Sequence, residues 1–176
     1  MKNIEIIKIN EELFRIGKYE FIKFTAENGN IIGVLKDSLG DMRFGDNNDF
    51  SKSDILKNLN GEFLHEIESI VGAENVLEFE TDLTSVDGSK KHGTMKSKVS
   101  LPTFDFYRQH RATFAKYKLD DWWWLATPHT TSEHMNDWWV SCVSPGGNIN
   151  NNNYNNSNGV RPFLTFVSTI FDSLIN

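Results

Sequence analysis

The chain has one cysteine, Cys142, among its 176 residues, and it lacks any long apolar run. A lone thiol cannot build an internal disulfide framework, so the sequence suits a reducing compartment. No segment approaches the roughly 20 apolar residues that a membrane-spanning helix needs, so membrane insertion is not expected. The N-terminal MKNIEIIKIN carries charges throughout and does not resemble a signal peptide. We expect a location in the cytoplasm of the producing cell or on a virion.

Positive charge is also scarce. Lysine and arginine together number 18 against 24 aspartates and glutamates, which gives a formal net charge of −6. A general nucleic-acid ligand is therefore not expected, because phosphate binding needs a positive surface. Residues 87–98 are locally basic and rich in Gly and Ser. They predict a solvated, mobile loop; the alternative is a phosphate-contacting arm, although no aromatic residue is present for base stacking.

Two features of the C-terminal third stand out against these absences. All five tryptophans lie within residues 122–139, and eight asparagines lie between Asn148 and Asn158. Residues 138–143 and 160–167 have the apolar, β-branched character of strands. The polar tract between them therefore predicts a long loop, and loops of that length are usually functional or disordered. Asparagine offers both a donor and an acceptor, so the loop suits recognition of a polar surface.

The N-terminal third has the alternation of half-buried strands at residues 4–9, 14–24 and 31–35. Asn28-Gly29 predicts a hairpin between the last two, because both residues tolerate positive φ. Residues 51–71 predict two short helices that begin with Ser51 as N-cap and break at Gly61.

A third helix is predicted to begin at Thr103 as its N-cap, followed by apolar residues at helical spacing. His110 lies on that apolar stripe and is interpreted as a partly buried histidine. Together the elements predict a single α+β domain over residues 1–176, with antiparallel sheets and two or three helices.

Catalytic and metal-binding patterns are weak. Cys142 sits inside an apolar β-run, where a thiol is poorly ionised, and a structural role is the better interpretation. His129 and His134 lack the helical spacing of a zinc motif. Asn136 and Asp137 precede a tryptophan as in a calcium-binding lectin element, but no second acidic cluster accompanies them. We expect no enzyme activity, no cofactor and no metal.

The pair of segments DWWWLATP and GVRPFLTF resembles a domain of unknown function that is widespread in bacterial and phage-encoded proteins. Members carry a WWLRSP-like element followed by a GVRP-like strand. That domain in turn resembles C-type-lectin-like folds, including the formylglycine-generating-enzyme core and the variable proteins of diversity-generating retroelements. Ala126-Thr127 replaces the arginine-serine pair of the motif, so any role of that arginine is absent here.

The resemblance implies structural roles for Trp123, Trp124, Gly159, Arg161 and Pro162, with Arg161 as a buried or semi-buried hydrogen-bonded brace, and it places the asparagine tract at the position of a ligand-facing loop. Trp138 is expected to be structural as well. The expected contact face consists of Asn148, Asn150, Asn151, Asn152, Asn153, Tyr154, Asn155, Asn156, Asn158, His129, His134, Asn136 and Asp137.

These observations predict a non-enzymatic recognition module that binds a macromolecular surface, with protein as the expected partner. Within that class, one alternative is an adhesive component of a phage or cell surface, and another is a phage-encoded inhibitor of a host defence protein. Calcium-dependent glycan binding and a formylglycine-type oxidase are alternatives of other classes.

Overall fold

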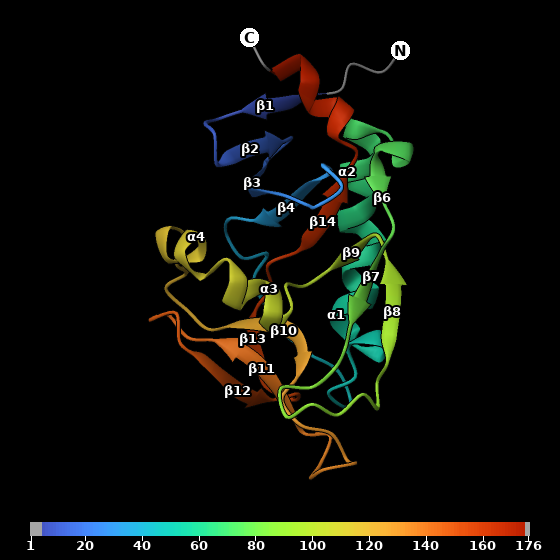
Figure 1. Ribbon diagram of the computed structural model, residues 1–176, viewed down its shortest axis with the longest axis vertical. Helices are drawn as coiled ribbons and strands as arrows, with labels where there is room; N and C mark the ends of the chain where they lie inside the picture. The colour runs from blue at the N-terminus through green and yellow to red at the C-terminus, as the bar shows by residue number, and fades with distance from the viewer. Residues whose placement is uncertain (1–4, 175–176) are drawn as a thin grey trace.

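The computed structural model describes residues 5–174 and is an α+β fold with curled, mainly antiparallel sheets and few helices (Figure 1). The larger sheet contains, in spatial order, β1 (Ile6–Lys8), β2 (Leu13–Ile16), β3 (Tyr19–Thr25), β4 (Ile31–Leu35), β14 (Phe163–Phe166) and β6 (Val76–Leu77), and β9 (Val99–Ser100) also pairs with β14. The second sheet contains, in order, β12 (Ile149–Asn153), β11 (Trp139–Val143), β10 (Trp123–Pro128), β13 (Ser157–Gly159) and β5 (Asp41–Arg43). A separate ribbon pairs β7 (Phe79–Asp82) with β8 (Thr94–Ser97).

The helices are short and lie on two sides of the sheets (Figure 1). One group contains η1 (Phe50–Lys52), α1 (Asp54–Asn58), a π-helical turn η2 (Leu59–Phe63), α2 (Leu64–Val71) and η3 (Ala73–Asn75). The other contains α3 (Phe104–Gln109) and α4 (Arg111–Lys116), and η4 (Ser168–Leu174) follows the last strand. Every helix in residues 5–174 falls short of the length and apolarity of a membrane span.

The predicted hairpin at Asn28-Gly29 is confirmed. The Gly29 N–H donates to Ala26 O at 2.9 Å, and Gly29 has a φ of +84°, which explains the glycine. The run predicted over residues 14–24 is two strands, β2 and β3, separated by a turn at Gly17. The first predicted strand is observed as β1, and Ile4 lies outside the described residues.

The helix starts are confirmed in one case and wrong in the other. Thr103 caps α3 by accepting a hydrogen bond from the Phe106 N–H at 3.2 Å. Ser51 does not cap α1; that role belongs to Ser53, whose hydroxyl accepts from the Leu56 N–H at 3.0 Å. A strong capping residue two positions later competes successfully for the same orphan N–H groups.

Two breaks divide the predicted helices. Gly61 has φ −99° and ψ −116°, so the helix kinks there, as predicted. The apolar stripe that follows Thr103 is divided at His110, where α3 ends and α4 begins. His110 is half-buried against Phe24, with ring centroids 4.8 Å apart, and burial lowers its pKa.

Two apolar clusters meet at strand β10. Trp124 faces the cluster that contains the helices α1 and α2, whereas Trp123 and Leu125 face the cluster that contains α3 and α4. Because successive strand residues point to opposite faces, both faces of β10 are buried. This explains why the WWWLATP segment lacks polar alternation, and it fixes β10 as a rigid base for the connections at its ends.

Candidate functional site

The asparagine tract was predicted as a loop, and this prediction was wrong. Residues 149–153 form β12, the edge strand of the second sheet, and Ser157–Gly159 forms β13 after a tight turn. β12 pairs with β11 over five residues, with Asn152 opposite Val140 and Asn150 opposite Cys142. Asparagine has a low strand propensity, so hydrogen bonds made by the asparagine side chains have to compensate for this low propensity.

The asparagine side chains cover the free edge of β12. The Ser144 N–Asn148 O and Tyr154 N–Trp138 O bonds fix the ladder so that the N–H groups of Asn151 and Asn153 point away from β11. Each of these N–H groups donates instead to the preceding side chain. The bond from Asn151 N to the Asn150 Oδ1 atom measures 2.8 Å, and that from Asn153 N to the Asn152 Oδ1 atom measures 2.9 Å.

Asn152 is the centre of an amide network in the turn that follows. Its Nδ2 donates to Asn158 Oδ1 at 3.0 Å, and its Oδ1 accepts from Asn156 Nδ2 at 2.6 Å. Asn158 is only 4% exposed, so it is withdrawn from the surface on which we expected it. Much of the tract therefore serves the fold, and Asn148 and Asn155 remain exposed for external contacts.

The connection from β10 to β11, residues 129–138, lies beside the asparagine turn and is fixed at its base. Asn48 is fully buried, and its Nδ2 donates to the carbonyl oxygens of Thr130 at 2.6 Å and Trp139 at 2.9 Å. Its Oδ1 contacts His92 Nε2 at 3.0 Å, and its backbone N–H donates to Asp137 O at 3.0 Å. One buried amide thus holds three chain segments together.

The connection from β7 to β8, residues 83–93, joins the same site. Burial alone would raise the pKa of Asp87, but hydrogen bonds from Ser85, Thr130 and His134 outweigh it and lower the pKa to about 2. The Thr130 hydroxyl donates to Asp87 Oδ2 at 2.7 Å, and His134 Nδ1 lies 3.2 Å from the same oxygen.

A second bridge between these two connections runs through Ser89. Thr131 donates to the Ser89 hydroxyl at 2.7 Å, and Ser89 donates to Glu133 Oε2 at 2.6 Å. Ser89 is 2% exposed and Thr131 is fully buried. The segment that was predicted to be a mobile basic loop is therefore anchored at this point, and its last part forms β8.

Two large apolar side chains project from the anchored connection. Met135 is 74% exposed and Trp138 is 56% exposed. We expected a structural role for Trp138, and its side chain is instead more than half exposed. Asn136 Oδ1 accepts from the Trp138 N–H at 3.0 Å, and Asp137 Oδ1 accepts from the Ser132 N–H at 2.5 Å. Asn136 and Asp137 thus shape the turn that presents Trp138.

An open pocket of about 360 Å³ joins the two halves of the predicted contact face. Its lining residues are Asp87, His129, Thr130, His134, Met135, Trp139 and Asn151. His129 Nδ1 is buried and has no hydrogen-bond partner among residues 5–174. The structure therefore brings both predicted histidines together with Asn151 of β12.

Within residues 5–174, no group of three or more His, Cys, Asp or Glu side chains is arranged to hold a metal ion. Cys142 is fully buried in β11, and burial raises its pKa to about 12. The thiolate that nucleophilic or redox chemistry requires is therefore scarce at neutral pH.

The remaining structural residues lie around β10 and β14. Trp123 and Trp124 are buried, and the Trp124 Nε1 donates to Met42 O at 2.8 Å. Gly159 sits where a Cβ atom would lie 2.9 Å from the Ser38 hydroxyl, which explains the glycine. Pro162 is buried, and its carbonyl oxygen accepts a hydrogen bond from the Leu35 N–H of β4 at 2.9 Å.

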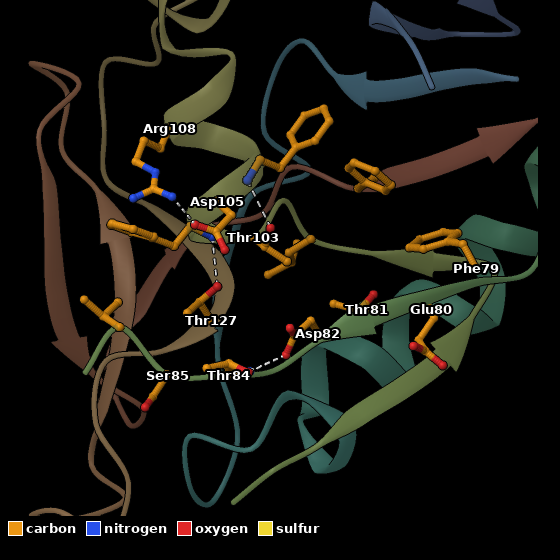
Figure 2. A pocket seen from close by; sticks show the side chains of 15 residues that line it. Phe79, Glu80, Thr81, Asp82, Thr84, Ser85, Thr103, Asp105, Arg108 and Thr127 are labelled. Atoms are coloured by element: carbon orange, nitrogen blue, oxygen red, sulfur yellow. Dashed lines mark hydrogen bonds and ion pairs between the residues drawn. The ribbon is translucent and has the colours of Figure 1, made fainter. Parts of the chain in front are cut away.

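A larger open pocket of about 400 Å³ between β7 and α3 was not predicted from the sequence (Figure 2). Leu101 and four aromatic rings provide its apolar lining: Phe79, Phe104, Phe106 and Phe163. Acidic side chains from both elements surround this lining, and Arg108 is paired with Asp105 at 2.8 Å. The four phenylalanines come from three separate elements, so no local sequence pattern predicted the pocket.

The fold and these sites define an α+β protein with several open pockets and a β10–β11 connection that exposes Trp138. The chain belongs to the family described as Domain of unknown function (DUF6273), whose model matches residues 79–168. That span includes every residue that lines the pocket between β7 and α3, together with the β10–β11 connection and the asparagine strand. Neither a curated protein nor a solved structure matches the chain.

Proposed function

We propose that the protein is a non-enzymatic recognition module that binds another protein through the surface around Trp138. This surface, the Trp138 face, consists of the exposed side chains of Met135 and Trp138 and the adjoining pocket lined by His129, His134 and Asn151. The observation that carries the proposal is the 56% exposure of Trp138 on a connection that buried hydrogen bonds hold in place.

The energetics favour a binding role for this arrangement. An exposed tryptophan loses the stabilisation of burial, and it offers a partner a large, rigid and amphipathic contact. Tryptophan is enriched at the energetic centres of interfaces, and methionine adapts to irregular surfaces. The anchored base means that little conformational entropy is lost when a partner binds.

The asparagine strand contributes to this role differently from what the sequence suggested. Two of its outward N–H groups, those of Asn151 and Asn153, already donate to side chains, and this disfavours binding by strand addition. The proposed contacts are the free side chains of Asn148, Asn151 and Asn155, with Tyr154 half-buried behind the turn. A C-type-lectin-like relationship, which we also propose, is supported by the WWL and GVRP elements lying side by side, since Trp123 of β10 pairs with Gly159 of β13.

Affinity capture tests the proposal. The wild-type protein and the Trp138→Ser and Trp122→Ser variants are immobilised and exposed to lysate of cells that encode the chain. Trp122 is a matched control because its side chain is 36% exposed and because it immediately precedes β10, whereas Trp138 follows the connection that leaves the other end of that strand. We expect a protein that the wild type and Trp122→Ser retain and that Trp138→Ser loses by tenfold or more.

The identity of the captured protein separates the two settings. A cytosolic defence effector supports an inhibitor, whereas an envelope protein supports an adhesive component. Equal capture by all three chains, or no specific capture, would overturn the assignment of the Trp138 face.

The pocket between β7 and α3 favours a second candidate function, the binding of a small organic cation with an apolar group. Figure 2 shows Asp82 and Asp105 on opposite sides of the pocket. Within the described residues, neither Glu80 nor Asp82 forms a salt bridge, and the aromatic lining suits a ring. Calorimetric titration with phenethylamine should give saturable binding that Asp82→Asn weakens, and phenylacetate should not bind there.

A further inference from the structure

A separate pocket lies at the opposite end of the β11–β12 hairpin, between α4 and the turn at Gly146-Gly147. It is open and has a volume of about 150 Å³, which accommodates several waters or a small ion. Among the described residues that line it, Arg111, Lys118 and Arg161 are cationic and none is acidic. This local excess of positive charge contrasts with the net charge of −6 of the whole chain.

Arg161 is the most constrained of the three cations. It is 1% exposed, and its guanidinium lies 4.9 Å from the Trp123 ring centroid and 5.4 Å from that of Phe114. Its Nε donates to Leu35 O at 2.9 Å and its Nη2 donates to Lys36 O at 2.7 Å. These bonds form the brace expected from the GVRP resemblance, and they use two of the five N–H donors of the guanidinium.

The positive charge of Arg161 has no anionic partner inside the fold. Among residues 5–174, no carboxylate lies within 4.0 Å of the guanidinium. Burial lowers the pKa of Arg161 to about 10, and the charge of Asp37 opposes this change. A buried charge is costly unless an opposite charge compensates it. Stacking on two aromatic rings and hydrogen bonds to two carbonyl groups offset this cost, but neither supplies an opposite charge.

We propose that this pocket binds a small carboxylate that bears an apolar group, with Arg161 at its base and Arg111 and Lys118 at its opening. A guanidinium matches a carboxylate in geometry, and a ligand with one negative charge would neutralise the buried site. The walls formed by Tyr107, Phe114 and Trp123 suit a ring or alkyl group on the ligand.

The rim of the pocket is already arranged for such a ligand. Tyr107 donates from its hydroxyl to Gly147 O at 2.7 Å, which fixes the turn between β11 and β12. Gly147 has a φ of +81°, a conformation that side-chain-bearing residues rarely adopt. The site is independent of the Trp138 face, because β11 separates Trp138 at one end from this turn at the other.

Titration with sodium benzoate, at constant ionic strength, tests the proposal. Binding is measured by calorimetry and by the NMR shifts of the Gly146 and Gly147 amides, which report the pocket locally. We expect saturable binding in the millimolar range or tighter, benzoate stronger than acetate, and no binding of benzylamine at the same amides.

Two double variants test whether benzoate binds in this pocket, and neither is expected to unfold the protein. Arg111 and Lys118 are exposed, so the double variant Arg111→Gln/Lys118→Gln is expected to fold and to weaken benzoate binding about tenfold or more. Lys90→Gln/Lys96→Gln removes the same charge elsewhere and should leave binding unchanged. Absence of benzoate binding, equal binding of benzylamine, or equal weakening by both double variants would overturn the proposal.

Discussion

Replacement of Asn48 by alanine is expected to destabilise the protein and to release the connection that carries Trp138. The Asn48 amide makes contacts of 2.6, 2.9 and 3.0 Å with Thr130 O, Trp139 O and His92 Nε2. Alanine removes all three contacts and cannot admit replacements, because the position is fully buried.

The magnitude follows from the groups that are left without a partner. Trp139 O keeps the hydrogen bond from the His129 N–H, so Thr130 O and His92 Nε2 are the two groups that lose theirs. At about 1–3 kcal/mol for each group left unsatisfied, we expect the free energy of unfolding to fall by about 2–6 kcal/mol for Asn48→Ala. At about 2–4 °C per kcal/mol for a chain of this size, Tm should fall by roughly 10 °C.

Urea unfolding followed by tryptophan fluorescence measures the change, and limited proteolysis reports cleavage within residues 129–138. Asn155→Ala is the control, because Asn155 is exposed and its side chain makes no hydrogen bond to a described residue. It should alter the unfolding free energy by less than about 0.5 kcal/mol. A loss below about 1 kcal/mol in Asn48→Ala, with unchanged proteolysis, would refute the anchoring argument.

Further predictions concern burial. Trp124→Ala should cost about 3–5 kcal/mol of unfolding free energy, whereas Trp138→Ala should cost less than about 1 kcal/mol, as measured by urea unfolding. Cys142 should react with a thiol reagent only upon unfolding, since burial raises its pKa to about 12; fast labelling of the folded chain would contradict this. Burial lowers the pKa of His92 and His110, so the unfolded chain binds protons more readily and stability should decline as pH falls below about 6.5. NMR titration of the two rings should give pKa values below that number.

The sequence predicted those elements whose signals are local. The hairpin at Asn28-Gly29, the kink at Gly61 and the cap at Thr103 each depend on a few neighbouring residues, and all three are confirmed. Ser51 failed as a cap because Ser53 offers the same chemistry two residues later. The capping propensity of serine alone does not predict whether Ser51 or Ser53 caps the helix.

The surface was harder to predict because it depends on contacts between segments that are distant in the sequence. Asparagine has a low strand propensity, so the tract predicted a loop; pairing with β11 and the amide bonds of Asn150 and Asn152 override that preference. The exposure of Trp138 could not be inferred either, because it belongs to an aromatic pair much like Trp123 and Trp124, which are buried in β10. The anchoring role of Asn48 depends on contacts with residues more than 80 positions away.

The covered edge of β12 has a consequence for behaviour at high concentration. Asparagine-rich segments that expose an unpaired strand edge are prone to stack into fibrils, because each chain templates the next. Here the Oδ1 atoms of Asn150 and Asn152 occupy the N–H groups that an incoming chain would need. The repeated residue that would otherwise promote self-assembly thus protects two of the exposed N–H groups, and shortening the Asn150 and Asn152 side chains should raise the tendency of the protein to aggregate.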